Sequence, residues 1–456
     1  MNKKLFNEFS EVTSKEWKQK IQFDLKGADY NETLIWHTPE GINVKPFYHS
    51  EDLNQTSTTP GKATSRWNIG QRIYAGNELL ANRKAIDVLN RGAESLMFCI
   101  PSDNTDINTL LQDIDFSSVP LYFEFEFLSV NYIKKLKDFF AGKNARIYLN
   151  IDIIGTLART GNWYQNLSED FNSLGEISSL NQKRVFESTL SIDLSLYQNA
   201  GANIVQQLAY SIAHACEYLN RFPDIHLTFN VSVGSNYFFE IAKLKALRVL
   251  WSSLVPEFNN QSAPHIIATP SKRNKTLYDY NVNMLRTTTE CMSAILGGAD
   301  AVFNSPYDSI YHKDNEFADR IARNQLLILK SESYFDKTGN PTDGSFYIES
   351  ITDQLAEKGL ELFKKIEEAG GFLKQLKNHT IQKKIKEAAE NEQNLFNDKE
   401  EVLIGTNKYQ NPDDRMKNEI ELYPFMKKQS GKTLIEPIIE KRLAESLEQE
   451  RLKTEN

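Results

Sequence analysis

The chain has 456 residues, of which 40% are hydrophobic and 11% aromatic, so it can bury a large core and exceeds the usual size of one compact core. The 53 Lys and Arg residues against 61 Asp and Glu residues give a net charge of -8 without a dense basic stretch, which argues against nucleic acid as a partner. No apolar run approaches the ~20 residues of a membrane span, and the first residues lack a secretory signal, so we expect a soluble, cytoplasmic protein without membrane contacts.

The first 65 residues are predicted to form an N-terminal arm. Turn-forming residues follow one another over residues 36–48 too closely for a core element. The opening segment combines several lysines with the large apolar side chains of Leu5, Phe6, Phe9 and Trp17. Apolar side chains at an exposed terminus usually need a surface to cover, so we expect the arm to pack against something.

Over residues 66–350, short β-branched and aromatic runs alternate with longer runs of helical period, which is typical of βα units and a parallel sheet. The predicted strands are Ile73–Gly76, Ser95–Pro101, Leu121–Phe127, Arg146–Ile153, Ser188–Leu194, His226–Val233, His265–Thr269 and Ala299–Asn304. Eight is the strand number of a closed barrel. The sequence therefore predicts an α/β protein with a (β/α)8 barrel of the TIM type, which explains the pattern better than an open sheet does.

A C-terminal helical extension is predicted for residues 351–456. Ile351–Ala369 has helical period and stops at two glycines, and Thr380–Glu401 is a charged helical stretch. From Leu434 onward the tail is predicted to be a solvated helix.

Cysteine and histidine usage points to neither a disulfide framework nor a metal site. Cys99, Cys216 and Cys291 are far apart and each sits in an apolar segment, as expected of reduced thiols that pack as small hydrophobic side chains. His214 and Cys216 are two residues apart on a predicted helix and cannot easily share a face. We therefore expect no metal ion.

Several segments resemble the barrel half of methylmalonyl-CoA mutases, in the order and spacing of that family. They are Arg72–Gly76, Asn236–Trp251, Arg286–Met292, Asp343–Ser345 and Leu403–Tyr409. The second of these is a long and specific match to the helix that the family writes as Asn-Phe-Phe-x-Glu-x-Ala-Lys-Leu-Arg. The resemblance extends from about residue 36 to residue 409.

The resemblance implies a barrel that binds acyl-CoA, followed in catalytic members by a flavodoxin-like domain that holds cobalamin through an Asp-x-His-x-x-Gly loop. Only a charged tail follows Tyr409 here, whereas such a domain needs on the order of a hundred residues. The one Asp-x-His, Asp224–His226, lacks the glycine and begins a predicted strand. We therefore expect no flavodoxin-like cobalamin domain and no cofactor on this chain, with adenosylcobalamin held by a large partner subunit.

The family's active-site residues are only partly present. A family histidine donates a hydrogen bond to the thioester carbonyl, and Leu196, which cannot donate one, stands at the matching position. The family's Thr-His-Arg-Gly loop is replaced by Ser102–Thr105. Arg72 and Tyr74 match residues that approach the acyl-CoA, although retention for packing at the barrel mouth explains them better. We therefore expect no catalytic residue and treat Arg72 and Tyr74 as candidate substrate-binding residues.

Bulky side chains on several strands raise the hypothesis that the barrel axis is plugged. They are Leu96, Phe98, Ile100, Leu121, Phe123, Phe125, Leu227, Phe229 and Val231. The same side chains could equally face the outer helices.

The leading hypothesis is a structural, non-catalytic small subunit of a heterodimeric methylmalonyl-CoA mutase, an isomerase of succinyl-CoA and methylmalonyl-CoA. In the family the arm wraps the partner subunit, and docking of the arm on its own barrel is an equal alternative. A rival hypothesis is an active acyl-CoA mutase barrel that uses a separate cobalamin-binding chain. A third is a free acyl-CoA-binding protein.

Overall fold

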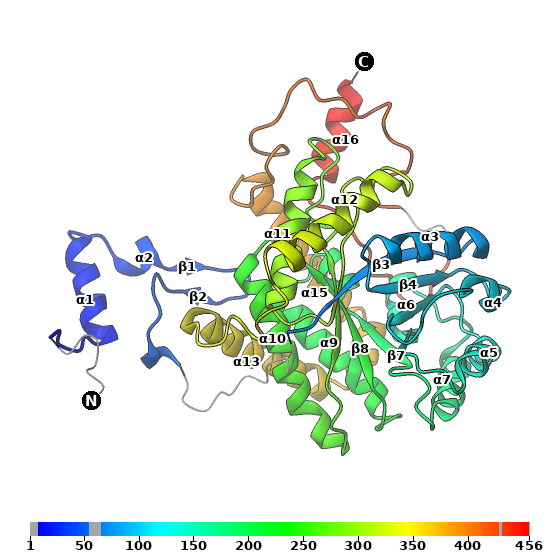
Figure 1. The fold of residues 1–456 in the computed structure, drawn as a ribbon. Coiled ribbons are helices and arrows are strands. Elements are labelled where there is room, and N and C mark those ends of the chain that lie inside the picture. Colours follow the sequence, from blue (N-terminus) through cyan, green and yellow to red (C-terminus); the bar gives the residue numbers. More distant parts are fainter. Residues whose placement is uncertain (1–7, 54–64, 428–430, 456) are drawn as a thin grey trace.

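An eight-stranded parallel sheet forms the centre of the molecule (Figure 1), and the computed structural model describes residues 8–53, 65–427 and 431–455. The strands are β3 (Asn68–Tyr74), β4 (Ser95–Ile100), β5 (Leu121–Phe125), β6 (Ile147–Asn150), β7 (Leu190–Asp193), β8 (Leu227–Val233), β9 (His265–Pro270) and β10 (Ala301–Phe303). They pair in the order β6-β5-β4-β3-β10-β9-β8-β7, and a bridge between Tyr148 and Ser188 joins β6 to β7. The predicted (β/α)8 barrel is confirmed.

The first barrel strand differs most from its prediction, since it begins at Asn68 rather than at Ile73. Gly70 and Gln71 interrupt the apolar pattern that marks the other strands. Gly70 is required because a Cβ there would lie 2.5 Å from the ring of Phe303. Gln71 is buried and pairs with helix side chains outside the sheet, so its polarity is satisfied.

Helices follow the strands and cover the outside of the barrel (Figure 1). They are α3 (Glu78–Asn90), α4 (Ile107–Leu110), α5 (Val130–Phe140), α6 (Ile153–Thr160), α7 (Leu167–Leu180), α8 (Leu194–Asn199), α9 (Ile204–Leu219), α10 (Tyr237–Leu254), α11 (Val282–Leu296) and α12 (Glu316–Leu327). Short 3-10 segments occur at Ser50–Asp52 and Val255–Phe258, and a π-helical turn at Ile328–Glu332 extends α12. Most of these helices follow an N-cap Asn, Asp or Ser whose side chain accepts a hydrogen bond from a backbone N–H of the first turn. Asn203 caps α9 in this way.

The two faces of the sheet bury different side chains. The bulky residues that suggested a plugged axis, such as Phe98, Phe123 and Phe229, belong to the main hydrophobic cluster and face the outer helices. A second cluster forms inside the barrel, from Met97, Tyr122, Tyr148, Ile267, Ala301 and Phe303. The idea that the first set fills the axis is therefore wrong, because each strand alternates its faces and the other set points inward.

Side chains from opposite sides of the barrel meet across its axis. The Tyr122 hydroxyl on β5 lies 2.9 Å from His265 Nε2 on β9, and these two strands are four places apart in the sheet order. The Tyr148 ring on β6 stacks on His265 at 4.2 Å between centroids. The N-terminal half of the barrel is thus filled by side chains, as is usual for this fold.

Three helices after the barrel pack back onto it, namely α13 (Phe346–Glu368), α14 (Phe372–Lys377) and α15 (Thr380–Asn397). The longest, α13, lies against α9 and α10. The tail contradicts the prediction of a solvated helix from Leu434. Residues 434–444 are not helical, Ile435, Ile438 and Leu443 are buried, and only α16 (Glu445–Thr454) is a helix.

The N-terminal arm projects from the barrel (Figure 1). It consists of α1 (Ser14–Asp24), α2 (Tyr30–Leu34) and the antiparallel pair β1 (Trp36–His37) and β2 (Asn43–Val44). Helix α1 buries none of its residues, and Trp17 and Phe23 are 54% and 79% exposed. The predicted residues Leu5 and Phe6 lie outside the described residues. Helix α1 is therefore not docked on the barrel of its own chain.

Candidate functional site

The barrel mouth, where the C-terminal ends of the strands lie, holds the predicted substrate-binding residues. Active sites of TIM-type barrels are built at this end. Arg72 and Tyr74 lie at the end of β3 and point inward in alternation with buried Ile73. Tyr74 is 56% exposed at the rim.

Arg72 is paired with an acid of the same chain. Its Nε and a terminal nitrogen donate to Glu124 Oε2 at 3.1 and 2.5 Å, and Cys99 Sγ lies 3.2 Å from the same oxygen. Burial alone would raise the pKa of Glu124, but the charge and hydrogen bond of Arg72 lower it below its usual value. The ion pair therefore persists at neutral pH, and the Arg72 guanidinium already has a carboxylate partner.

A second group of charges lies over the ends of β6, β7 and β9, near enough for the charge of Arg159 to help lower the pKa of Glu124. Arg159 on α6 binds Asp193 at the end of β7 and donates to Glu440 Oε1 at 3.1 Å. Glu440 comes from the tail, and its other oxygen accepts from Lys272 at 3.3 Å. Positive and negative groups therefore alternate over the ends of β6, β7 and β9.

Most of these charged residues were missed by the sequence analysis. Glu124 is the next-to-last residue of β5 and Asp193 is the last residue of β7, and an acid near the carboxyl end of a barrel strand is a signal for the mouth that could have identified them. Glu440 carries no such signal, because only tertiary structure brings the tail to the barrel.

Leu196, at the position of the family's histidine, lies in the first turn of α8. Its side chain is 1% exposed within the main hydrophobic cluster. The next residue, Tyr197, places its hydroxyl 2.9 Å from His214 Nδ1, and His214 Nε2 lies 3.0 Å from an Asp152 oxygen. These buried contacts through His214 hold α8 in place. The Leu196 side chain offers no hydrogen-bond donor to the mouth.

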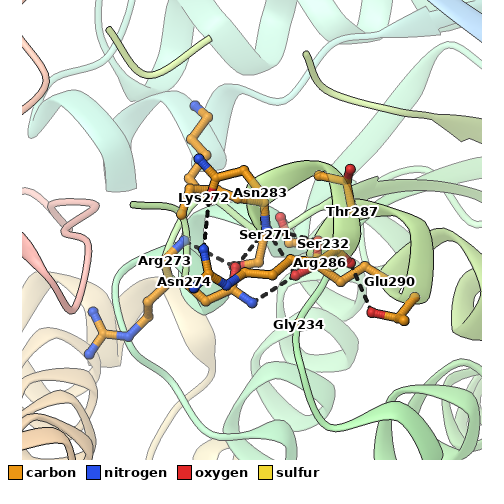
Figure 2. A network of polar contacts seen from close by, with 12 residues as sticks. Ser232, Gly234, Ser271, Lys272, Arg273, Asn274, Asn283, Arg286, Thr287 and Glu290 are labelled. Atoms are coloured by element: carbon orange, nitrogen blue, oxygen red, sulfur yellow. Dashed lines mark hydrogen bonds and ion pairs between the residues drawn. The ribbon is translucent and has the colours of Figure 1, made fainter. Parts of the chain in front are cut away.

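A buried polar network supports the mouth below the loop that follows β9 (Figure 2). Lys275 Nζ donates to both oxygens of Glu290 at 2.9 and 2.8 Å, and Asn274 donates to Glu290 at 2.7 Å. Arg286 on α11 donates to Asn283 at 2.9 Å. These residues bond to one another, so their role is to hold the loop against α11.

The three cysteines are unpaired and buried, as predicted. Burial raises the pKa of Cys216 to about 12 and raises the pKa of the other two thiols further. Because the thiolate is the reactive form, we expect no reaction of the native chain with a thiol reagent such as Ellman's reagent at pH 7.5, and reaction of all three thiols in denaturant. Absorbance at fixed times measures both, and fast native labelling of any cysteine would contradict the burial described here.

The part of the chain that the structure describes contains no flavodoxin-like domain and no cluster of metal ligands. Apart from the barrel sheet and the short arm hairpin, no other sheet occurs in residues 8–53, 65–427 and 431–455. His226 of the Asp-x-His sequence lies directly before β8, on the opposite end of the barrel from the mouth. In the same ranges no group of three His, Cys, Asp or Glu side chains could hold a metal, and no helix is long and apolar enough to cross a membrane.

Comparison with known proteins identifies the family. The family model for methylmalonyl-CoA mutase matches residues 102–452. The chain is 34% identical to the methylmalonyl-CoA mutase small subunit of Porphyromonas gingivalis, over 90% of this chain and 71% of that protein. It is 29% identical to the methylmalonyl-CoA mutase of Rhizobium meliloti, over 90% and 65%, and 28% identical to the small subunit of Streptomyces virginiae, over 83% and 67%. The chain thus spans about two thirds of the length of these relatives, and it belongs to the methylmalonyl-CoA mutase family.

Proposed function

We propose that the chain is the small subunit of a heterodimeric, cytoplasmic methylmalonyl-CoA mutase and does not itself catalyse the isomerisation. The observation that carries this proposal is the burial of Leu196 in the hydrophobic core. Carbonyl polarisation needs a donor aimed at the substrate, and an aliphatic side chain supplies none. Two similar proteins that bear the name small subunit support the assignment.

The charged groups at the mouth also favour a non-catalytic role. Arg72 is engaged by Glu124, and Arg159 is engaged by Asp193 and Glu440. A substrate carboxylate would have to displace an acid of the chain before it could use either guanidinium. Adenosylcobalamin and the chemistry of the complex are assigned to the large subunit in this proposal.

The arm provides the surface for the partner. Helix α1 exposes Trp17 and Phe23 and buries no residue of its own. Such apolar side chains on a projecting element are typical of a protein interface. We assign them to contact with the large subunit, whose stability would gain from this burial.

Reconstitution tests the proposal. The chain is mixed with adenosylcobalamin and either the large subunit or an isolated cobalamin-binding chain, and succinyl-CoA isomerisation is followed by chromatography of the products. We expect turnover only with the large subunit and a single cobalamin per heterodimer. A Trp17→Ala and Phe23→Ala double variant is expected to weaken assembly, whereas Lys20→Ala on the same helix should not.

Turnover with the isolated cobalamin-binding chain would instead establish the rival function, an active barrel with a separate cofactor chain. Calorimetric binding of CoA to the chain alone would support a free acyl-CoA-binding protein. Either result would contradict the structural role proposed here.

A further inference from the structure

The hairpin of β1 and β2 attaches the projecting arm to the barrel (Figure 1). Ile42, in the turn of the hairpin, is fully buried in the main hydrophobic cluster, and the Trp36 ring meets Phe239 of α10 edge-on at 5.8 Å between centroids. Asn203, the N-cap of α9, donates a side-chain hydrogen bond to the Pro39 carbonyl oxygen at 3.3 Å. The hairpin is thus seated on the beginnings of two barrel helices.

Glu40, in the turn of this hairpin, brings an acid group into the contact. One of its carboxyl oxygens, Oε2, is buried and has no hydrogen-bond partner among the described residues. Burial raises the pKa of Glu40, and hydrogen bonds from its own backbone, from the Thr38 side chain and from the Ile204 backbone at the start of α9 offset this rise only in part. The group is therefore more easily buried with its proton than without it.

Glu240 and Lys243 of α10 lie near enough to Glu40 to affect its charge. Lys243 Nζ lies 2.5 Å from Glu240 Oε2, and both side chains are almost fully buried. The negative charge of Glu240 raises the pKa of Glu40 further. The buried group therefore contains two acids and one base, and Lys243 is already committed to Glu240 when Glu40 loses its proton.

Other groups at the hairpin favour the ionised form of Glu40. The first N–H groups of α9 carry a partial positive charge, and Lys358 Nζ of α13 would lie 3.7 Å from a Cβ on Gly41. His37 of β1 is exposed, with Nδ1 2.7 Å from the Asn43 side-chain oxygen, and adds positive charge when it is protonated. The pKa of Glu40 is raised in spite of these groups, so burial and Glu240 dominate.

We propose that Glu40 makes the seating of the hairpin depend on pH, because its acid form fits the buried contact and its carboxylate form does not. Release of the hairpin exposes Glu40 to water and returns its pKa to the usual value. The seated state therefore binds more protons than the released state, and its stability falls as pH rises from the usual pKa through the raised one. Acidic pH holds the arm in one direction, and alkaline pH frees it to turn. The proposal does not depend on the subunit role, since all these contacts lie within one chain.

Hydrogen–deuterium exchange of the full chain tests this proposal. The reporters are the amides of Thr38 and Gly41, which donate to the carbonyl oxygens of Ile42 and Thr38 at 3.1 and 2.9 Å. Strands of two residues do not hold such bonds once the hairpin leaves the barrel. After correction for intrinsic exchange rates, protection of these amides in the parent chain should fall at least about threefold between about pH 5.5 and about pH 8.5. Glu40→Gln removes the charge, and its protection should stay constant.

Two comparisons make the result specific to Glu40. His37 is the same in the parent chain and in Glu40→Gln, so any effect of its charge cancels when the two pH profiles are compared. Glu32→Gln removes an exposed acid of α2 and should keep the pH profile of the parent chain. Equal pH profiles for the parent chain and Glu40→Gln, a flat profile for the parent chain, or loss of protection in Glu40→Gln at every pH would each overturn the proposal.

Discussion

Replacement of Glu290 by alanine is expected to lower the free energy of unfolding by about 3–5 kcal/mol, because it leaves a buried lysine without its carboxylate partner. Glu290 is 1% exposed and accepts from Lys275 and Asn274. Burial lowers the pKa of Lys275, and the charge of Glu290 opposes this lowering. In the variant Lys275 must either stay charged without that partner or lose its proton, and both cost free energy at pH 7.

The matched control is Thr289→Ala, the exposed neighbour of Glu290 on α11. Substitutions at exposed positions usually change stability by less than about 0.5 kcal/mol. Unfolding in guanidinium chloride, followed by far-UV circular dichroism, should show a large fall in midpoint for Glu290→Ala and almost none for Thr289→Ala. Similar midpoints for both would mean that the Lys275–Glu290 pair does not support the mouth.

The second large effect is expected inside the barrel, where Tyr122→Ala should cost about 3–5 kcal/mol. Tyr122 is fully buried, contacts His265 across the axis and stacks on Tyr148 at 4.8 Å between ring centroids. Side chains from opposite strands cannot move together to refill this space, because the closed sheet holds the strands apart. The cavity therefore remains in the variant.

Tyr122→Phe separates packing from hydrogen bonding. This variant keeps the ring and loses the bond to His265, which is worth about 1 kcal/mol. Thermal melts should therefore rank the parent chain first, Tyr122→Phe second and Tyr122→Ala a distant third. If the two variants melted together, the ring would not fill the axis as described.

The number of strands and their places could be predicted because each strand is a short apolar run bounded by turn residues. Which side chains of each strand point toward the barrel axis could not be predicted. Both faces of a barrel strand are buried, so Leu96 and Met97 look alike in the sequence although the first meets helices and the second meets the axis. Only the pairing of neighbouring strands decides which set points inward.

The non-helical course of the tail over residues 434–443 escaped prediction for another reason. Its local sequence favours a helix around Lys441 and Leu443, but bonds to loops far away in the sequence outweigh that preference. The candidate site shows the same limit. Arg72 could be predicted from its motif, whereas its partner Glu124 lies 52 residues away and is brought to it by strand register.

The barrel closes between β6 and β7, and this contact is where local opening of the sheet is expected to begin. Between β6 and β7 the sheet is joined by the Tyr148–Ser188 bridge and a few backbone bonds, whereas every other neighbouring pair of strands forms a continuous ladder. Local opening follows the fewest hydrogen bonds. We therefore expect the backbone amides along this line to exchange with deuterium before those of the continuous ladders.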